Sequence, residues 1–130
     1  MEKLSVRTQS RTELVDITAG VQAAAAKSGV DSGICFVFVP HTTAGVTINE
    51  NADPGVCRDI IKEMNAVIPR EDNYAHAEGN SAAHIKASLV GFSVNVFVEQ
   101  RRLQLGTWQG IYFAEFDGPR SREVWVRFLV

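Results

Sequence analysis

The residues best suited to chemistry are three histidines, His41, His76 and His84, and all three lie outside the apolar runs of the chain. Three neutral imidazoles suit zinc or another borderline divalent metal, and they leave one coordination position open for water or a substrate. Their spacing matches no short zinc motif such as HExxH, and histidines scattered in this way are more often unrelated surface residues. Their placement in loops supports the metal hypothesis, because functional sites concentrate on loops held by a rigid scaffold.

The C-terminal third of the chain carries further polar residues that a ligand could use. Glu115 lies inside the otherwise apolar segment 111–116, where a carboxylate needs a partner or a metal. Arg120 and Arg122 follow a glycine–proline turn, and their guanidinium groups suit a phosphate or a carboxylate, although an ordinary surface turn is an equal reading. Trp108 and Gln109 stand between two glycines, which fits either a ligand-facing pair or a tryptophan packed in a bulged strand.

The segment His76–Gly91 predicts a helix that positions His84. Asn80 or Ser81 can cap its first turn, and Gly91 can end it. One face of this helix is apolar, with residues at i, i+3 and i+7, namely Ala82, Ile85 and Leu89. His84 falls on a different face, together with Asn80 and Ser88, so we expect its ring to point toward something polar.

The remaining pattern predicts an α+β fold with a mixed sheet and about three helices, in a single domain over residues 1–130. Thr18 can cap a helix over 19–27, and Asp53 with Pro54 can begin a second helix that runs to about Ala66. The apolar run 33–39 predicts a strand covered on both faces. Further extended segments are expected within 3–18 and at 46–50, 93–98, 103–105, 107–116 and 123–130. Residues 117–120 are expected to form a hairpin turn before the last strand.

The composition of the chain limits the classes of partner that we expect it to bind. The chain has 130 residues, 45% of them hydrophobic, and a net charge of −2, which provides no general attraction to nucleic acid or to an anionic membrane. No apolar run approaches the length of about 20 residues that spans a bilayer. Cys35 and Cys57 are isolated, which favours two reduced thiols in the cytoplasm. We therefore expect a cytoplasmic protein without nucleic-acid or membrane partners.

Four blocks in order, at 41–54, 76–91, 106–110 and 115–120, resemble the YjbQ family, identified as secondary thiamine-phosphate synthases. The resemblance covers essentially the whole chain. It implies a compact α+β subunit, a homotrimer, and a metal pocket near a subunit interface. It also implies zinc, or another divalent ion, bound by His41, His76 and His84. Catalytic roles are then expected for Glu115, Arg120 and Gln109, and substrate contacts for Asn51, Asn80, Thr43, Trp108 and Arg122.

The implied reaction joins a pyrimidine pyrophosphate to a thiazole phosphate and releases pyrophosphate. Pyrophosphate chemistry usually employs magnesium with oxygen ligands, whereas three histidines favour zinc-like ions. We therefore hypothesise that thiamine-phosphate formation is a side reaction of an enzyme that acts on a small phosphorylated molecule. Two alternatives stay open: a non-catalytic trimer that binds a small anionic metabolite at the three-histidine site, and a structural metal that ties three subunits together.

Overall fold

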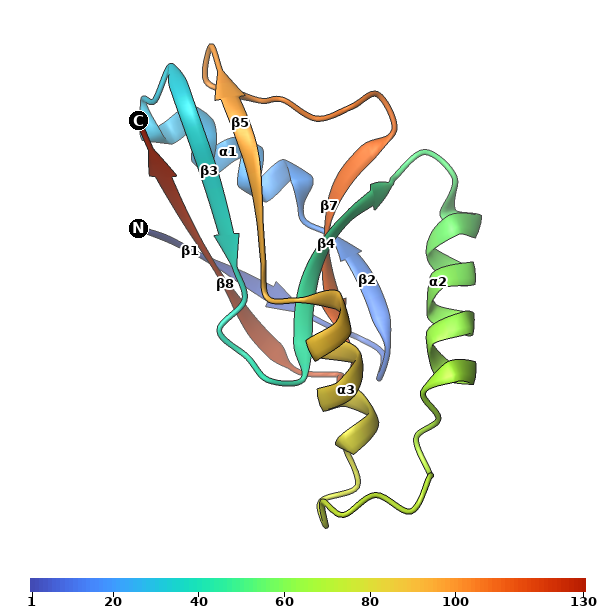
Figure 1. Cartoon of the computed structure of the whole chain (residues 1–130). Coiled ribbons are helices and arrows are strands. Elements are labelled where there is room, and N and C mark those ends of the chain that lie inside the picture. The colour runs from blue at the N-terminus through green and yellow to red at the C-terminus, as the bar shows by residue number, and fades with distance from the viewer.

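Eight strands and three helices build the computed structural model, which describes residues 1–130 (Figure 1). The strands are β1 (Glu2–Arg7), β2 (Glu13–Asp16), β3 (Ser32–Phe38), β4 (Ala44–Glu50), β5 (Ser93–Glu99), β6 (Arg102–Leu103), β7 (Gln109–Glu115) and β8 (Ser121–Leu129). The helices are α1 (Thr18–Ser28), α2 (Pro54–Val67) and α3 (Ser81–Val90). The α+β class and the three helices are as the sequence predicts.

The strands form two antiparallel sheets rather than the single mixed sheet that the sequence suggested. One sheet has the order β1-β8-β3-β5-β6 and the other the order β2-β7-β4. The main hydrophobic core lies between their inner faces and α1. Parallel pairing arises when a helix returns the chain to the sheet it left. Here α1 leads from β2 to β3, and α2 with α3 leads from β4 to β5, so each helical connection changes sheet.

Strand β3 is buried on one face only, which corrects the expectation of a strand covered on both. Cys35 and Val37 point into the core and are fully buried, whereas Phe36 and Phe38 alternate with them and are exposed. This alternation is typical of an antiparallel sheet with one open face. The open face of the five-stranded sheet therefore carries aromatic side chains in the single chain.

The first two helices begin and end largely as local rules require. Thr18 is the first residue of α1 rather than its cap, because its hydroxyl donates to Asp16 Oδ1 and accepts from the Ile111 N–H. Gly29 ends α1 at φ 75°, where glycine has no Cβ penalty. Asp53 caps α2 through Gly55 N–H, at 2.8 Å. None of the three helices is both long enough and apolar enough to cross a membrane.

Helix α3 packs with a different face from the one expected. Its buried residues are Ala82, Ala83, Lys86 and Ala87, whereas Leu89 is 70% exposed. Ala83 and Ala87 pack against Ala114, in β7, and Phe116, in the turn that follows. Small side chains allow the helix to approach the three-stranded sheet closely, and this contact outweighs the larger apolar surface on the other side.

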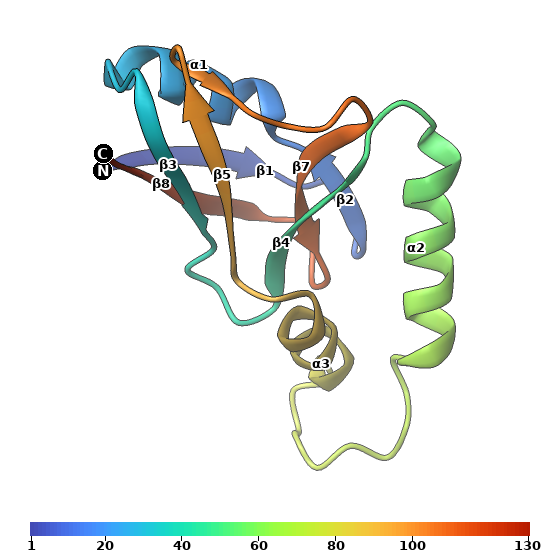
Figure 2. The same cartoon turned by 45° about the horizontal axis from the view of Figure 1, so that its top comes forward.

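Three connections cross from one sheet to the other at the same end of the molecule, and we call them the three crossings. They are residues 8–12, between β1 and β2, residues 39–43, between β3 and β4, and residues 116–120, between β7 and β8. Figure 2 shows them gathered beside α3. Backbone hydrogen bonds join the crossing 116–120 to each of the other two: Thr8 N–H to Arg120 O and Gly118 N–H to Arg11 O on one side, and Phe116 N–H to Thr43 O on the other. Residues 117–120 are therefore no hairpin, since β7 and β8 belong to different sheets.

Candidate functional site

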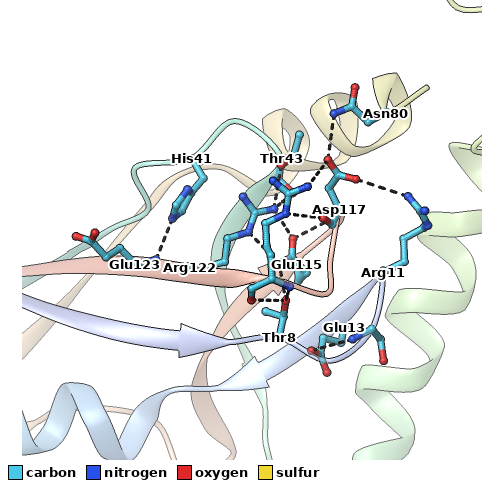
Figure 3. A network of polar contacts seen from close by, with 12 residues as sticks. Thr8, Arg11, Glu13, His41, Thr43, Asn80, Glu115, Asp117, Arg122 and Glu123 are labelled. Carbon is cyan, nitrogen blue, oxygen red and sulfur yellow. Dashed lines mark hydrogen bonds and ion pairs between the residues drawn. The ribbon is translucent and has the colours of Figure 1, made fainter. Parts of the chain in front are cut away.

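A buried polar cluster joins the three crossings, and it consists of Thr8, Thr43, Glu115 and Arg122 (Figure 3). We call it the crossing cluster. Oε1 of Glu115 accepts hydrogen bonds from Thr8 Oγ1, at 2.8 Å, and from Arg122 Nε, at 2.9 Å. Its Oε2 accepts from Arg122 Nη2 and from the Asp117 N–H, at 3.0 Å. Arg122 Nη2 also donates to Thr43 Oγ1, at 2.9 Å.

These contacts leave no free lone pair on Glu115 for a substrate, because a carboxylate accepts about four hydrogen bonds. Burial by itself raises the pKa of the Glu115 carboxyl, but the hydrogen bonds from Arg122, Asp117 and Thr8 lower it below its usual value. The partner that the sequence required for Glu115 is therefore Arg122. In this conformation Glu115, Arg122 and Thr43 hold the crossings together instead of facing a ligand.

Asp117 links the crossing cluster to α3. Its carboxylate accepts from Asn80 Nδ2, at 3.0 Å, and pairs with Arg120, at 3.2 Å, and Arg11, at 3.6 Å. The Nδ2 of Asn80 donates to Asp117, and the side-chain oxygen of Asn80 accepts no hydrogen bond from the first turn of α3, so Asn80 precedes the helix without capping it. Arg120 is 49% exposed along its side chain. Of the arginines expected in the site, Arg120 is therefore the one that a ligand can reach.

His41 lies on the crossing between β3 and β4. Its Nε2 accepts a hydrogen bond from the Glu123 N–H, at 3.0 Å. Burial lowers the pKa of His41, and the nearby Arg122 guanidinium lowers it further. A neutral ring that accepts at Nε2 carries its proton on Nδ1, so neither nitrogen has a free lone pair for a metal in this arrangement.

His76 and His84 are brought together at the start of α3. Their ring centroids lie 5.4 Å apart, and the ring planes are perpendicular. His76 also lies near Glu78, with 3.8 Å between Nε2 and Oε2. No group of three or more histidine, cysteine, aspartate or glutamate residues within the chain could hold a metal. One chain thus assembles two of the three expected ligands.

The expected ligand contacts at Asn51, Trp108 and Gln109 lie at the opposite end of β7. Gln109 begins this strand and Glu115 ends it, so about 20 Å separates them at 3.3 Å per residue. Asn51 N–H donates to Trp108 O, at 2.9 Å, and Gln109 Oε1 accepts from Gly106 N–H, at 2.8 Å. Within one chain these residues do not reach the crossing cluster.

Sequence reasoning missed a pocket of about 280 Å³ beside α3. It is lined by the end of α2, the first half of α3 and the crossing between β1 and β2, and it includes Arg11, Arg70 and Lys86. The available signal was Lys86 itself. It follows Ala82 and Ala83 by three to four residues and precedes Ala87, which places a charge on the small-residue face of the helix.

Comparison with known proteins identifies the relatives of the chain. The family model described as UPF0047 protein YjbQ-like matches residues 2–130. The chain belongs to the YjbQ family. This YjbQ chain is 54% identical to UPF0047 protein MJ1081 of Methanocaldococcus jannaschii, over 98% of this chain and 92% of that protein. It is 49% identical to UPF0047 protein YugU of Bacillus subtilis, over 99% of this chain and 98% of that protein.

Solved YjbQ structures share the fold. A YjbQ/UPF0047 protein of Clostridium acetobutylicum superposes with a TM-score of 0.97 at 53% identity, covering 99% of this chain and all of the other. Protein TT1486 of Thermus thermophilus superposes with a TM-score of 0.93 at 44% identity, with the same coverage. The family resemblance seen in the sequence and the α+β fold that it implies are confirmed.

Proposed function

We propose that this YjbQ protein is a metal-dependent enzyme with thiamine-phosphate synthase-type activity, which joins a pyrimidine pyrophosphate to a thiazole phosphate and releases pyrophosphate. The observation that carries the proposal is the pairing of His76 with His84. A zinc ion lies about 3.2 Å from the centroid of a ligating imidazole, so two imidazoles at a tetrahedral angle have centroids about 5 Å apart. The separation of 5.4 Å between the two ring centroids is close to this distance.

Two imidazoles do not complete a zinc site, which takes three protein ligands in enzymes. We therefore place the metal between copies of the chain, in the homotrimer that the family resemblance implies. The open face of the five-stranded sheet supports assembly, because Phe36 and Phe38 on β3 are exposed and Phe97 on β5, which is 68% exposed, lies diagonally across from Phe36. Contiguous exposed aromatic surface is typical of an interface. His41 can serve as the third ligand only after it releases the Glu123 N–H.

The residues of the chain have distinct tasks in this proposal. Arg120 is held by Asp117, with its Nε donating to the Asp117 carbonyl at 2.9 Å, and it remains exposed enough to contact a pyrophosphate. Its guanidinium then offsets negative charge on the leaving group. The chemistry that a divalent ion supplies beside the histidine pair is further neutralisation of that charge.

Both thiols, Cys35 and Cys57, are free, which supports the expected cytoplasmic location.

The test combines metal analysis with turnover. We expect purified protein to hold a stoichiometric divalent ion and to form thiamine phosphate from the two phosphorylated precursors. His84→Ala removes one of the paired ligands and should abolish both properties. Ser88→Ala is the matched control, because Ser88 is exposed one turn further along α3 and donates only to the His84 carbonyl. It should leave metal content and turnover unchanged.

The alternatives give different results. Metal binding without turnover on any small phosphate would support a non-catalytic metabolite-binding protein. A metal whose removal dissociates and unfolds the assembly would indicate a structural ion, since such an ion has all its positions closed by protein. If neither the wild type nor the Ser88→Ala control binds a metal, the proposal is refuted. If turnover matches that of dedicated enzymes, the hypothesis of a side activity is wrong.

A further inference from the structure

The pocket beside α3 has an unusual charge distribution. Its volume is about 280 Å³, and its eleven lining residues include three cations, Arg11, Arg70 and Lys86, but no carboxylate. Neutral polar groups, among them Asn65 and Asn80, complete its polar surface. A concave site with convergent positive charge and no acid group is suited to an anion. We call it the α2–α3 pocket.

Lys86 is the residue that most needs explanation, because it is only 4% exposed. Its ammonium donates to Asn65 Oδ1, at 2.6 Å, and pairs with no carboxylate. Burial lowers the pKa of Lys86, which reflects the cost of removing the charge from water. Buried ammonium groups are normally paired, so Lys86 lacks the counter-charge that such a position requires.

Asn80 offers a second, independent sign of a ligand. It lines the same pocket at the N-terminus of α3, and its Oδ1 is buried without any hydrogen-bond partner. Its Nδ2 is already committed to Asp117. The free oxygen is an acceptor, which a P–OH group or a hydroxyl of a bound molecule would satisfy. The pocket thus has a buried cation for an oxyanion and, at a helix N-terminus, a free acceptor for a hydroxyl.

We propose that the α2–α3 pocket binds the phosphate group of a small phosphate monoester, with Lys86 as the buried counter-charge and Arg11 and Arg70 on the exposed side. Arg11 is still able to contact an anion, since its own pairing with Asp117 is long, at 3.6 Å. The volume of about 280 Å³ lies just below the range of about 300–1,000 Å³ for ligand pockets, which suits a phosphate with a short organic group. This inference needs neither a metal nor the histidine pair.

Calorimetric titration of the purified protein, as isolated, with inorganic phosphate, glycerol phosphate and acetate tests the proposal. We expect both phosphates to bind and to raise the unfolding temperature with concentration, as any ligand of the native state does. Acetate should bind at least tenfold more weakly, because it offers fewer oxygens and less charge. Tighter binding of glycerol phosphate than of inorganic phosphate supports a monoester as the ligand. If glycerol phosphate binds equally or more weakly, the assignment of a monoester is overturned.

Lys86→Met removes the charge while it keeps a side chain of similar length. We expect at least a tenfold loss of phosphate affinity, together with an unfolding temperature in phosphate-free buffer that is unchanged or higher. Lys27→Met is the matched control, because Lys27 lies at the end of α1 with its side chain exposed. It should retain affinity within twofold. Equal affinities in the two variants would overturn the proposal.

Arg70→Gln keeps the test decisive if Lys86→Met does not fold. Arg70 is exposed in the loop after α2, so its replacement should not disturb packing. We expect a several-fold loss of phosphate affinity and a weaker dependence of binding on salt. Wild-type affinity in Arg70→Gln would contradict the site. If phosphate binds as described while the metal-dependent turnover is absent, the proposed function fails and this inference stands.

Discussion

Replacing Glu115 by glutamine should destabilise the protein severely without touching any exposed surface. The glutamine amide can keep two of the four hydrogen bonds of Glu115, but its NH₂ then faces Arg122 Nη2 and the Asp117 N–H, which are donors. The Arg122 guanidinium also remains buried without its counter-charge. Breaking a buried ion pair in this way costs about 3–5 kcal/mol. That is a large part of a total stability of about 5–15 kcal/mol.

A double-mutant cycle in urea at pH 7 measures the coupling. Glu115→Gln and Arg122→Met should each be strongly destabilised, whereas the double variant should be at least about 2 kcal/mol more stable than the sum of the two losses predicts. Thr8 can still donate to the Arg120 carbonyl, at 3.1 Å, so its hydroxyl is not left unpaired. Additive losses, or a stable Glu115→Gln protein that has lost only its activity, would refute the structural role and favour the catalytic one.

The pH dependence of stability provides a second check on the same residue. The pKa of Glu115 is lower in the folded chain than its usual 4.5. A carboxyl with a lowered folded-state pKa stabilises the fold above its unfolded pKa, and this contribution is lost as pH falls through the folded value. Unfolding of the wild type should therefore become easier below about pH 4.5. The corresponding part of the acid dependence should be missing in Glu115→Gln.

Three further outcomes follow from the packing. Gly45→Ala should lower the free energy of unfolding by about 1–3 kcal/mol, because a Cβ there would lie 2.4 Å from the Gly91 carbonyl oxygen. Gly20→Ala in α1 should raise it by about 0.5–1 kcal/mol, because a Cβ there would make only an ordinary contact. Equal effects of the two substitutions in chemical denaturation would contradict this packing. The His41 imidazole should titrate below 6.5 in an NMR experiment, and a value at or above 6.5 would show that Arg122 and burial do not dominate. Leu89→Gln should change stability by less than about 0.5 kcal/mol, and a loss of several kcal/mol would mean that this face of α3 is covered.

Much of the local structure could be predicted because its causes are local. Asp53 and Pro54 specify the start of α2 through a cap and a preset φ, and Gly29 ends α1 because it adopts a positive φ. The need of Glu115 for a partner was also visible, since a carboxylate in an apolar strand must be paired. These inferences involve interactions over a few residues, or a single side chain and its medium.

The site was less predictable, since its parts are placed by contacts between distant segments. Thr8 and Glu115 are 107 residues apart in sequence and 2.8 Å apart at their side-chain oxygens. From its neighbours in the chain alone, Arg122 is expected to bind a ligand. In the folded chain its guanidinium donates hydrogen bonds to Glu115 and Thr43 instead. Gln109 shares a strand with Glu115 but lies at its other end. No spacing rule encodes these separations.

The sequence by itself determined the α+β class, the three helices with most of their ends, the family, and the residue types available for chemistry. Only the tertiary structure decided which sheet each strand joins, that α3 packs with its alanine face, and that His76 meets His84 while His41 lies elsewhere. The physical reason is that periodicity and capping act within one or two helical turns. Sheet partition and the pairing of buried charges depend instead on close packing between segments that the sequence separates widely.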